Sequence, residues 1–179
     1  SITSAGLDSY PIVKLIKPGQ VINGLDLPKP KSSQIAELFG EKLIAYEFDS
    51  EVDTEPHLVH TVDGKIVFIQ LTIPSALQDR YQDTLSLLGT PEIIQEKTPL
   101  EAQIAYPSQG IAFVGRKDMS YIWKIQKFPP KTKEAFLARE GKNYKPIKVF
   151  WDLYNKQIQA TQPAKLVETK KFKLDSVII

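Results

Sequence analysis

Few residues of the types that carry chemistry occur in this chain. Its 179 residues include two histidines, His57 and His60, and no cysteine, which excludes thiolate nucleophiles, disulfide bonds and cysteine-based metal sites. In one strand the two histidines would point to opposite faces of a sheet, because side chains alternate along a strand. The nearby Glu51, Asp53 and Glu55 could add oxygen ligands, but a polar loop beside a strand is the simpler interpretation. We therefore predict neither a bound metal nor a cofactor.

Hydrolytic chemistry has only weak support. No serine stands in the Gly-x-Ser-x-Gly sequence of a nucleophile elbow. A pair of catalytic carboxylates is harder to exclude, because such a pair is defined by its separation in space and not by sequence spacing. Conceivable members are Glu47, Asp49, Glu92, Glu96 and Glu101. Since charged residues are mostly exposed, solvated strand ends and loops are the simpler interpretation, and we expect a protein that is not an enzyme.

Charge and hydropathy narrow the class of partner. Lysine and arginine total 23 against 21 acidic residues, a net charge of +2, which provides no long-range field for attracting nucleic acid. The lysine-rich stretch 165–173 is interrupted by Glu168 and fits a solvated edge strand. There is no glycine-rich phosphate loop and no run near the roughly 18 apolar residues of a membrane span. We expect neither nucleic-acid binding nor a transmembrane segment.

The printed sequence begins at Ser1 and not with methionine. Removal of a leader and simple trimming would both explain such a start. A cysteine-free chain is compatible with the cytosol, and equally with an exported protein that is stable without disulfide bonds. Our expectation is an exported protein, periplasmic, lumenal or secreted, with membrane association only through a removed leader or an anchor.

The first part of the chain predicts an extended segment, a helix and three strands. Residues 1–31 contain four prolines, which disfavour helix, and we expect this lead-in to pack on the domain. A short helix over 32–39 follows, with Ile35, Leu38 and Phe39 on its buried stripe and Gly40 at its end. Strands are expected at 42–48, 57–62 and 65–73, with Asp63-Gly64 as a hairpin turn.

The second part repeats this order. A helix is predicted over 75–88, ended by Gly89, and is followed by an extended stretch at 92–96. Strands are expected at 102–106, 111–116 and 120–128. The tail contains a helix over 131–140, a helix or strand over 149–158, and a strand over most of 164–179. The chain is thus predicted to be α+β, an antiparallel sheet with short helices packed on one face.

Similar short sequence segments recur in the same order in the first and second parts of the chain, and they indicate an internal duplication of a helix-plus-meander unit. The first unit covers 32–74 and the second 75–130, with 131–179 as an extension of one compact body. The coincidences that any α+β domain produces are the alternative explanation.

Aromatic residues on the expected strands are the best candidates for binding. In the strand 120–128, Tyr121, Trp123 and Ile125 would share one face. Burial in the core is the favoured interpretation, but on a curved sheet Tyr121 and Trp123 would line an open concavity and anchor a protein partner. The same two interpretations, burial in the core or contact with a protein partner, apply to Tyr46, Tyr106 and Phe113.

A resemblance to a known family rests on three motifs of the second unit. They are Leu88-Gly89-Thr90-Pro91, Tyr106-Pro107-Ser108-Gln109-Gly110-Ile111-Ala112-Phe113 and Tyr121-Ile122-Trp123-Lys124-Ile125. This pattern resembles the β-lactamase-inhibitor-protein-like unit, also found in the small lipoprotein of the outer-membrane barrel-assembly machine. The inhibitor is a tandem pair of such units whose concave sheet grips a protein partner. The first unit departs from this pattern, because Glu41-Lys42 stands where the second unit has Thr90-Pro91 after its glycine.

Together these patterns favour a non-catalytic protein-binding or assembly module with another protein as its partner. A carrier of a small molecule or lipid, a carboxylate-dependent hydrolase and a structural subunit of a larger complex remain open alternatives.

Overall fold

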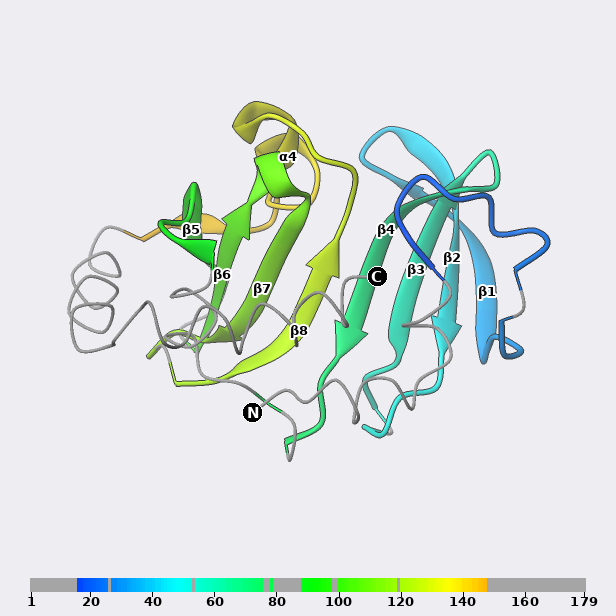
Figure 1. Cartoon of the computed structure of the whole chain (residues 1–179), viewed down its shortest axis with the longest axis horizontal. Helices are drawn as coiled ribbons and strands as arrows, with labels where there is room; N and C mark the ends of the chain where they lie inside the picture. The colour runs from blue at the N-terminus through cyan, green and yellow to red at the C-terminus, as the bar shows by residue number, and fades with distance from the viewer. Residues whose placement is uncertain are drawn as a thin grey trace.

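A computed structural model describes residues 16–25, 27–52, 54–75, 78, 88–97, 100–118 and 120–147. Within these ranges the chain is mainly β, and nine strands form one antiparallel sheet in the order β1-β2-β3-β4-β8-β7-β6-β5-β9 (Figure 1). The helical elements named in this part are the short helix α4 (Lys133–Ala138) and the 3-10 turn η2 (Pro107–Gln109). The predicted α+β class with short helices is therefore wrong for the described residues.

The sheet consists of two four-stranded meanders and a short final strand. The first meander is β1 (Ser32–Leu38), β2 (Glu41–Phe48), β3 (His57–Val62) and β4 (Lys65–Thr72). The second is β5 (Ile93–Glu96), β6 (Glu101–Tyr106), β7 (Ile111–Arg116) and β8 (Ile122–Lys127). β4 pairs with β8 in the middle of the sheet, and β9 (Lys145–Pro146) pairs with β5. The strands predicted from alternating apolar residues are thereby confirmed.

The predicted helix over 32–39 is wrong, because these residues form β1. Phe39 and Gly40 have φ of 55° and 76°, as a two-residue type I′ turn requires, and Leu38 pairs directly with Glu41. This turn matches the twist of antiparallel strands and produces a hairpin. Gly40 thus closes a hairpin and does not end a helix. The Asp63-Gly64 hairpin turn is confirmed, with φ of 51° and 78°.

Strand β8 contains an irregularity that changes which side chains face inward. Val114 pairs with Lys124 and Gly115 with Ile122, so Trp123 has no partner in β7. The extra residue lets Ile122 and Ile125 both reach the core, each with 0% exposure. The predicted face of Tyr121, Trp123 and Ile125 is therefore wrong.

The two faces of the sheet differ in character. The core face carries the main hydrophobic cluster, which includes Val59, Ile66, Ile104 and Phe113. The opposite face, which we call the glutamine face, carries hydrogen-bonded glutamines of four strands, three of them buried and Gln70 half-buried. There α4 places Phe136 against Phe128 and a smaller apolar cluster.

Segments flank the sheet at both ends of the described chain. Residues 16–25 run beside the β3–β4 hairpin, where Gly19 N donates to Ile66 O at 2.7 Å and Ile22 N donates to Gly64 O at 2.9 Å. The helix predicted over 131–140 is shorter, Lys133–Ala138, with Thr132 as its N-cap. The predicted elements at 149–158 and 164–179, and nearly all of the helix at 75–88, lie outside the described residues.

Candidate functional site

Two of the aromatic residues singled out from the sequence lie in the core. Tyr106 and Phe113 are buried, and their rings meet edge to face with centroids 6.4 Å apart. The Tyr106 hydroxyl donates to Gly89 O at 2.7 Å. These side chains hold the second meander together and present no surface to a partner.

The other three aromatic residues are more accessible but lie in different places. Tyr46 is half-buried on β2, packs against the core and stacks with Phe48 at 6.5 Å between centroids. Tyr121 precedes β8 and is 41% exposed. Trp123 is half-buried in a hollow of about 340 Å³ that Glu55 and Lys124 also line. The structure therefore does not gather these rings into one binding surface.

The two histidines lie on opposite faces of β3, as the sequence predicts. His57 is buried on the core face, where its Nδ1 accepts a hydrogen bond from Thr72 N at 3.1 Å. His60 lies on the glutamine face, 5.1 Å from the Phe68 ring between centroids. Burial lowers the pKa of each to about 4, with the Arg139 charge as a second cause for His60. Both imidazoles are therefore neutral near pH 7.

Four of the five candidate carboxylates have separate partners, and the fifth, Asp49, lines a different hollow with Lys31 and Ser50. Glu47 accepts a hydrogen bond from Ser32 Oγ, and Glu92 accepts from the backbone and hydroxyl of Ser108. Glu96 pairs with Lys117, and Glu101 accepts from the Tyr144 hydroxyl at 3.3 Å. In the described part of the chain no group of three or more His, Asp or Glu residues is placed to hold a metal ion.

A cavity of about 310 Å³ on the glutamine face brings apolar and polar side chains together. It lies between the tip of the β1–β2 hairpin, the strands β3, β4 and β8, and the segment that follows α4. Its apolar wall is formed by Leu38, Phe39, Leu43, Leu58 and Phe68. Its polar wall is formed by His60, Gln70, Lys97, Gln126, Arg139, Glu140, Asn143 and Tyr144.

A row of hydrogen-bonded glutamines runs across the sheet into this cavity. Gln95 Nε2 donates to Gln103 Oε1 at 3.2 Å, and Gln103 Nε2 donates to Gln126 Oε1 at 2.9 Å. Gln126 Nε2 then donates to Gln70 Oε1, also at 2.9 Å. Gln103 Nε2 further donates to Glu140 O at 3.3 Å, which ties the cavity wall to the sheet.

Sequence reasoning missed these glutamines. The sequence did contain one signal, because each of these glutamines occupies a strand position whose side chain points away from the apolar face. Which strands pair with which had to be known before the four glutamines could be placed side by side.

Ion pairs fix the segment after α4 over the cavity. Arg139 Nη2 lies 2.7 Å from Glu41 Oε2, which joins this segment to β2. Glu140 Oε1 lies 2.5 Å from Lys131 Nζ, and the Glu140 side chain is only 2% exposed. Burial raises the pKa of the Tyr144 hydroxyl, with the neighbouring Glu101 as a further cause, so this hydroxyl stays protonated.

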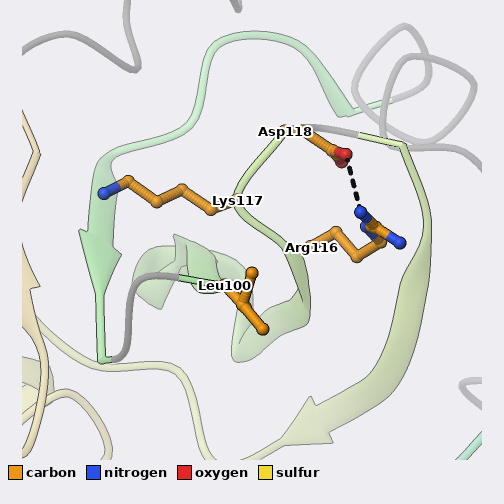
Figure 2. Close-up of a pocket in the computed structure, with 4 residues that line it drawn as sticks. All are labelled: Leu100, Arg116, Lys117 and Asp118. Carbon is orange, nitrogen blue, oxygen red and sulfur yellow. Dashed lines mark ion pairs between the residues drawn. The ribbon is translucent and has the colours of Figure 1, made fainter.

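Another hollow, of about 260 Å³, lies at the turn between β7 and β8 (Figure 2). Arg116 and Asp118 form an ion pair there at 3.2 Å, with both side chains more than half exposed. Figure 2 shows Lys117 extending away from that pair, and its partner is Glu96. Because these charges are already matched in contact with solvent, the cavity on the glutamine face is the stronger candidate site.

Comparisons with models of protein families, with curated proteins and with solved structures found no match. The resemblance to the β-lactamase-inhibitor-protein-like unit therefore stays a prediction. In the residues that the structure describes, no helix is long and apolar enough to cross a membrane.

Proposed function

We propose that this chain is a non-catalytic protein-binding or assembly module that accepts an extended segment of another protein along β1. The observation that supports this proposal is the position of that strand at one edge of the described sheet. β1 is the last strand at its end of the described sheet, and Ile35 at its centre is 79% exposed. A strand at a free edge presents unpaired N–H and C=O groups that an added strand can bond.

The contrast with the opposite edge strengthens this proposal. β9 has two residues, Lys145 and Pro146, and both shortness and proline are devices that protect a sheet edge from pairing. β1 has seven residues and contains neither proline nor lysine, with Glu37 as its one charged residue. Of the two edges of the described sheet, the β1 edge therefore has the length and composition to accept a partner strand.

Side chains beside this edge indicate the chemistry of the partner. Ile35 pairs directly with Ile44, which is 37% exposed, so two apolar side chains lie together at the edge of the core face. An added segment with an apolar residue beside Ile35 would bury both of them. A basic residue near Glu37 would add charge complementarity. The partner we expect is an extended segment that alternates apolar with polar or basic residues.

The expected exported location bears on where such a partner is found, and it stays a prediction of the sequence. The partner would be sought among periplasmic, lumenal or secreted proteins.

Partner capture combined with amide exchange tests the proposal. Full-length chain carrying Ile35→Lys is expected to lose a partner that the unsubstituted chain retains, because a lysine is placed where the added strand must pack. Leu100→Lys is the matched control, since Leu100 is 72% exposed and lies far along the chain, before β6. In the complex, amide hydrogen exchange of residues 32–38 should slow. A partner retained by Ile35→Lys, or exchange in β1 that does not change, would overturn the proposal.

A further inference from the structure

Alternate residues of β1 direct their backbone groups away from the sheet. The turn that follows β1 makes Leu38 and Glu41 a hydrogen-bonded pair. Hydrogen-bonded and non-hydrogen-bonded pairs alternate along an antiparallel ladder, so Ser33, Ile35 and Glu37 have their N–H and C=O groups on the outer edge. Among the described residues, these three make no backbone hydrogen bond beyond the ladder with β2. The edge can therefore accept another strand at these positions.

A second copy of β1 fits this edge in a symmetric register. Two antiparallel copies centred on Ile35 pair Ile35 with Ile35, and on either side they pair Ser33 with Glu37. Residues whose backbone groups point outward in one copy then meet the corresponding residues of the other, as an antiparallel ladder requires. Each of these pairs exchanges both of its backbone hydrogen bonds, so the outward N–H and C=O groups of β1 are satisfied.

The charges of the two copies are compatible in this register. Glu37 is the one charged residue of β1, and it faces the Ser33 hydroxyl of the second copy, which can donate to the carboxylate. The two Glu37 side chains are then separated by about 14 Å along the strands, more than the Debye length of about 8 Å at physiological ionic strength. Within its own chain Glu37 keeps Lys42 as its cross-strand neighbour. No like charges are therefore directly opposed.

The same register buries apolar side chains on the core face. Ile35 lies beside Ile44, and the two are 79% and 37% exposed. In the described part of the chain no other large apolar side chain is as exposed as Ile35. Pairing brings Ile35 against Ile35 of the second copy, so the isoleucines of both copies form one row across the two-fold axis. Cross-strand contacts between β-branched side chains stabilise a sheet.

Such a pairing closes on itself and is weak. A two-fold axis uses the same edge of both copies, and the opposite edge of the described sheet is the short strand β9, which contains Pro146 and is protected from pairing. The product is therefore a dimer and not a fibre. β1 contributes seven residues a side, fewer than the roughly 20–30 of a standard interface, so the dimer dissociates on dilution.

We infer that β1 pairs with β1 of a second copy of this chain, in the antiparallel register centred on Ile35, and that this dimer is the resting form of the strand-addition site. As an account of how that site is regulated, the inference rests on the function proposed above. A partner with a basic residue opposite Glu37 makes an ion pair where the second copy offers only the Ser33 hydroxyl, so the partner displaces the second copy. Until it does, self-pairing covers an edge that would otherwise aggregate.

Sedimentation velocity of the full chain tests the dimer. The unsubstituted chain should pass from monomer to dimer as its concentration rises from micromolar to millimolar. Ile35→Lys sets two lysines against each other at the two-fold axis and should stay monomeric. Leu100→Lys is the matched control, exposed and outside β1, and should dimerise as the unsubstituted chain does. An unsubstituted chain that stays monomeric throughout would overturn the inference, whether the β1 amides exchange freely or are protected by another segment of the same chain.

Oxidative cross-linking tests the register. The chain has no cysteine, so one introduced cysteine can form only a disulfide between copies. Directly opposed residues of a hydrogen-bonded pair have Cα atoms about 5.5 Å apart, a distance that a disulfide spans. Ile35→Cys should therefore cross-link at concentrations at which the dimer forms, whereas Ser33→Cys places the two thiols about 14 Å apart and should not. Equal cross-linking of the two variants would overturn the inference.

Charge substitutions at Ser33 separate self-pairing from strand addition by another protein. Ser33→Glu opposes Glu37 of the second copy at two symmetric positions and should raise the dissociation constant of the dimer about tenfold, whereas Ser33→Lys should lower it. Ser75→Glu, at an exposed position beyond the end of β4, should leave it unchanged. A basic partner should still bind Ser33→Glu.

The two proposals fail in different measurements. Equal dissociation constants for Ser33→Glu and Ser33→Lys dimers, measured without any partner, would overturn self-pairing and leave strand addition by another protein standing. A captured partner that is retained by Ile35→Lys would overturn the proposed strand addition, while the dimer of the unsubstituted chain would still form.

Discussion

Gln103 and Gln126 are hydrogen-bonded across an intervening strand: Gln103 Nε2 lies 2.9 Å from Gln126 Oε1, although β7 separates their strands. Ala112 of β7 pairs directly with Gln126 and is fully buried. Side chains of paired residues lie on the same face, so the Ala112 methyl group borders this contact. A larger side chain there would occupy the space in which the two amides meet.

Replacing that methyl group should break the glutamine row. Ala112→Leu is expected to lower the free energy of unfolding by about 2–4 kcal/mol, from overpacking together with the lost hydrogen bond. Urea unfolding measures this change. Ala36→Leu on the edge strand β1 is the control and should be nearly neutral. Equal effects of the two substitutions would mean that the row has no steric dependence on Ala112.

Gly110 is required for two separate reasons. Its φ is 68°, and a Cβ added there would overlap the Phe128 carbonyl oxygen. Gly40 has a similar φ of 76° with nothing within 4 Å of an added Cβ. Gly40→Ala should therefore cost about 1 kcal/mol from backbone strain alone, and Gly110→Ala at least about 3 kcal/mol. The difference, measured by urea unfolding, reports the overlap. Similar losses for the two variants would contradict this account.

The strand pattern was predictable from sequence, but the first hairpin was not. Alternating apolar residues located β2, β3 and β4, because one face of each of these strands is the more buried. β6 and β7 are buried on both faces, and short apolar runs bounded by turn residues located them. In β1, the spacing of Ile35, Leu38 and Phe39 imitates the buried stripe of a helix, whereas the structure leaves all three exposed. Type I′ turns favour asparagine, aspartate or glycine at their first central position, so Phe39 concealed the turn.

The candidate cavity could not be derived from sequence because its parts are distant in the chain. Gln103 lies 23 residues from Gln126, and Gln126 lies 56 residues from Gln70. No local pattern encodes those contacts, which depend on β4 pairing with β8. The irregularity of β8 at Trp123 was equally hidden, since one unpaired residue changes which side chains face inward.

Acid should destabilise the fold through its histidines before most carboxylates titrate. The folded pKa of His57 and His60 is about 4, against 6.5 for the unfolded chain. The unfolded state therefore binds more protons, and the stability present above pH 6.5 is lost as the pH falls toward 4. We expect a loss of about 2 kcal/mol for His57 between about pH 7 and 5, and less for the half-buried His60.

Urea unfolding at a series of pH values measures this loss. His60→Phe keeps a ring beside Phe68 and should flatten the pH dependence in part, leaving the share of His57. Stability that stays constant or rises as the pH falls from 7 to 5 would contradict the buried, neutral state of both rings.

The Lys131–Glu140 pair should be far more sensitive to loss of one partner than to loss of both. Their side chains are 16% and 2% exposed, so Lys131→Met leaves a buried carboxylate without its cation. This single change should cost about 3 kcal/mol, and adding Glu140→Met should restore much of it, because the uncompensated charge is then gone. A methionine at position 131 can also pack against the Phe128 ring, which Lys131 now covers at 5.2 Å.

Urea unfolding of the two single variants and the double variant measures the coupling between the residues. The exposed pair Arg116–Asp118 (Figure 2), with side chains 54% and 55% exposed, is the matched control and should show a coupling below about 1 kcal/mol. Equal coupling in the two pairs would mean that water reaches Glu140.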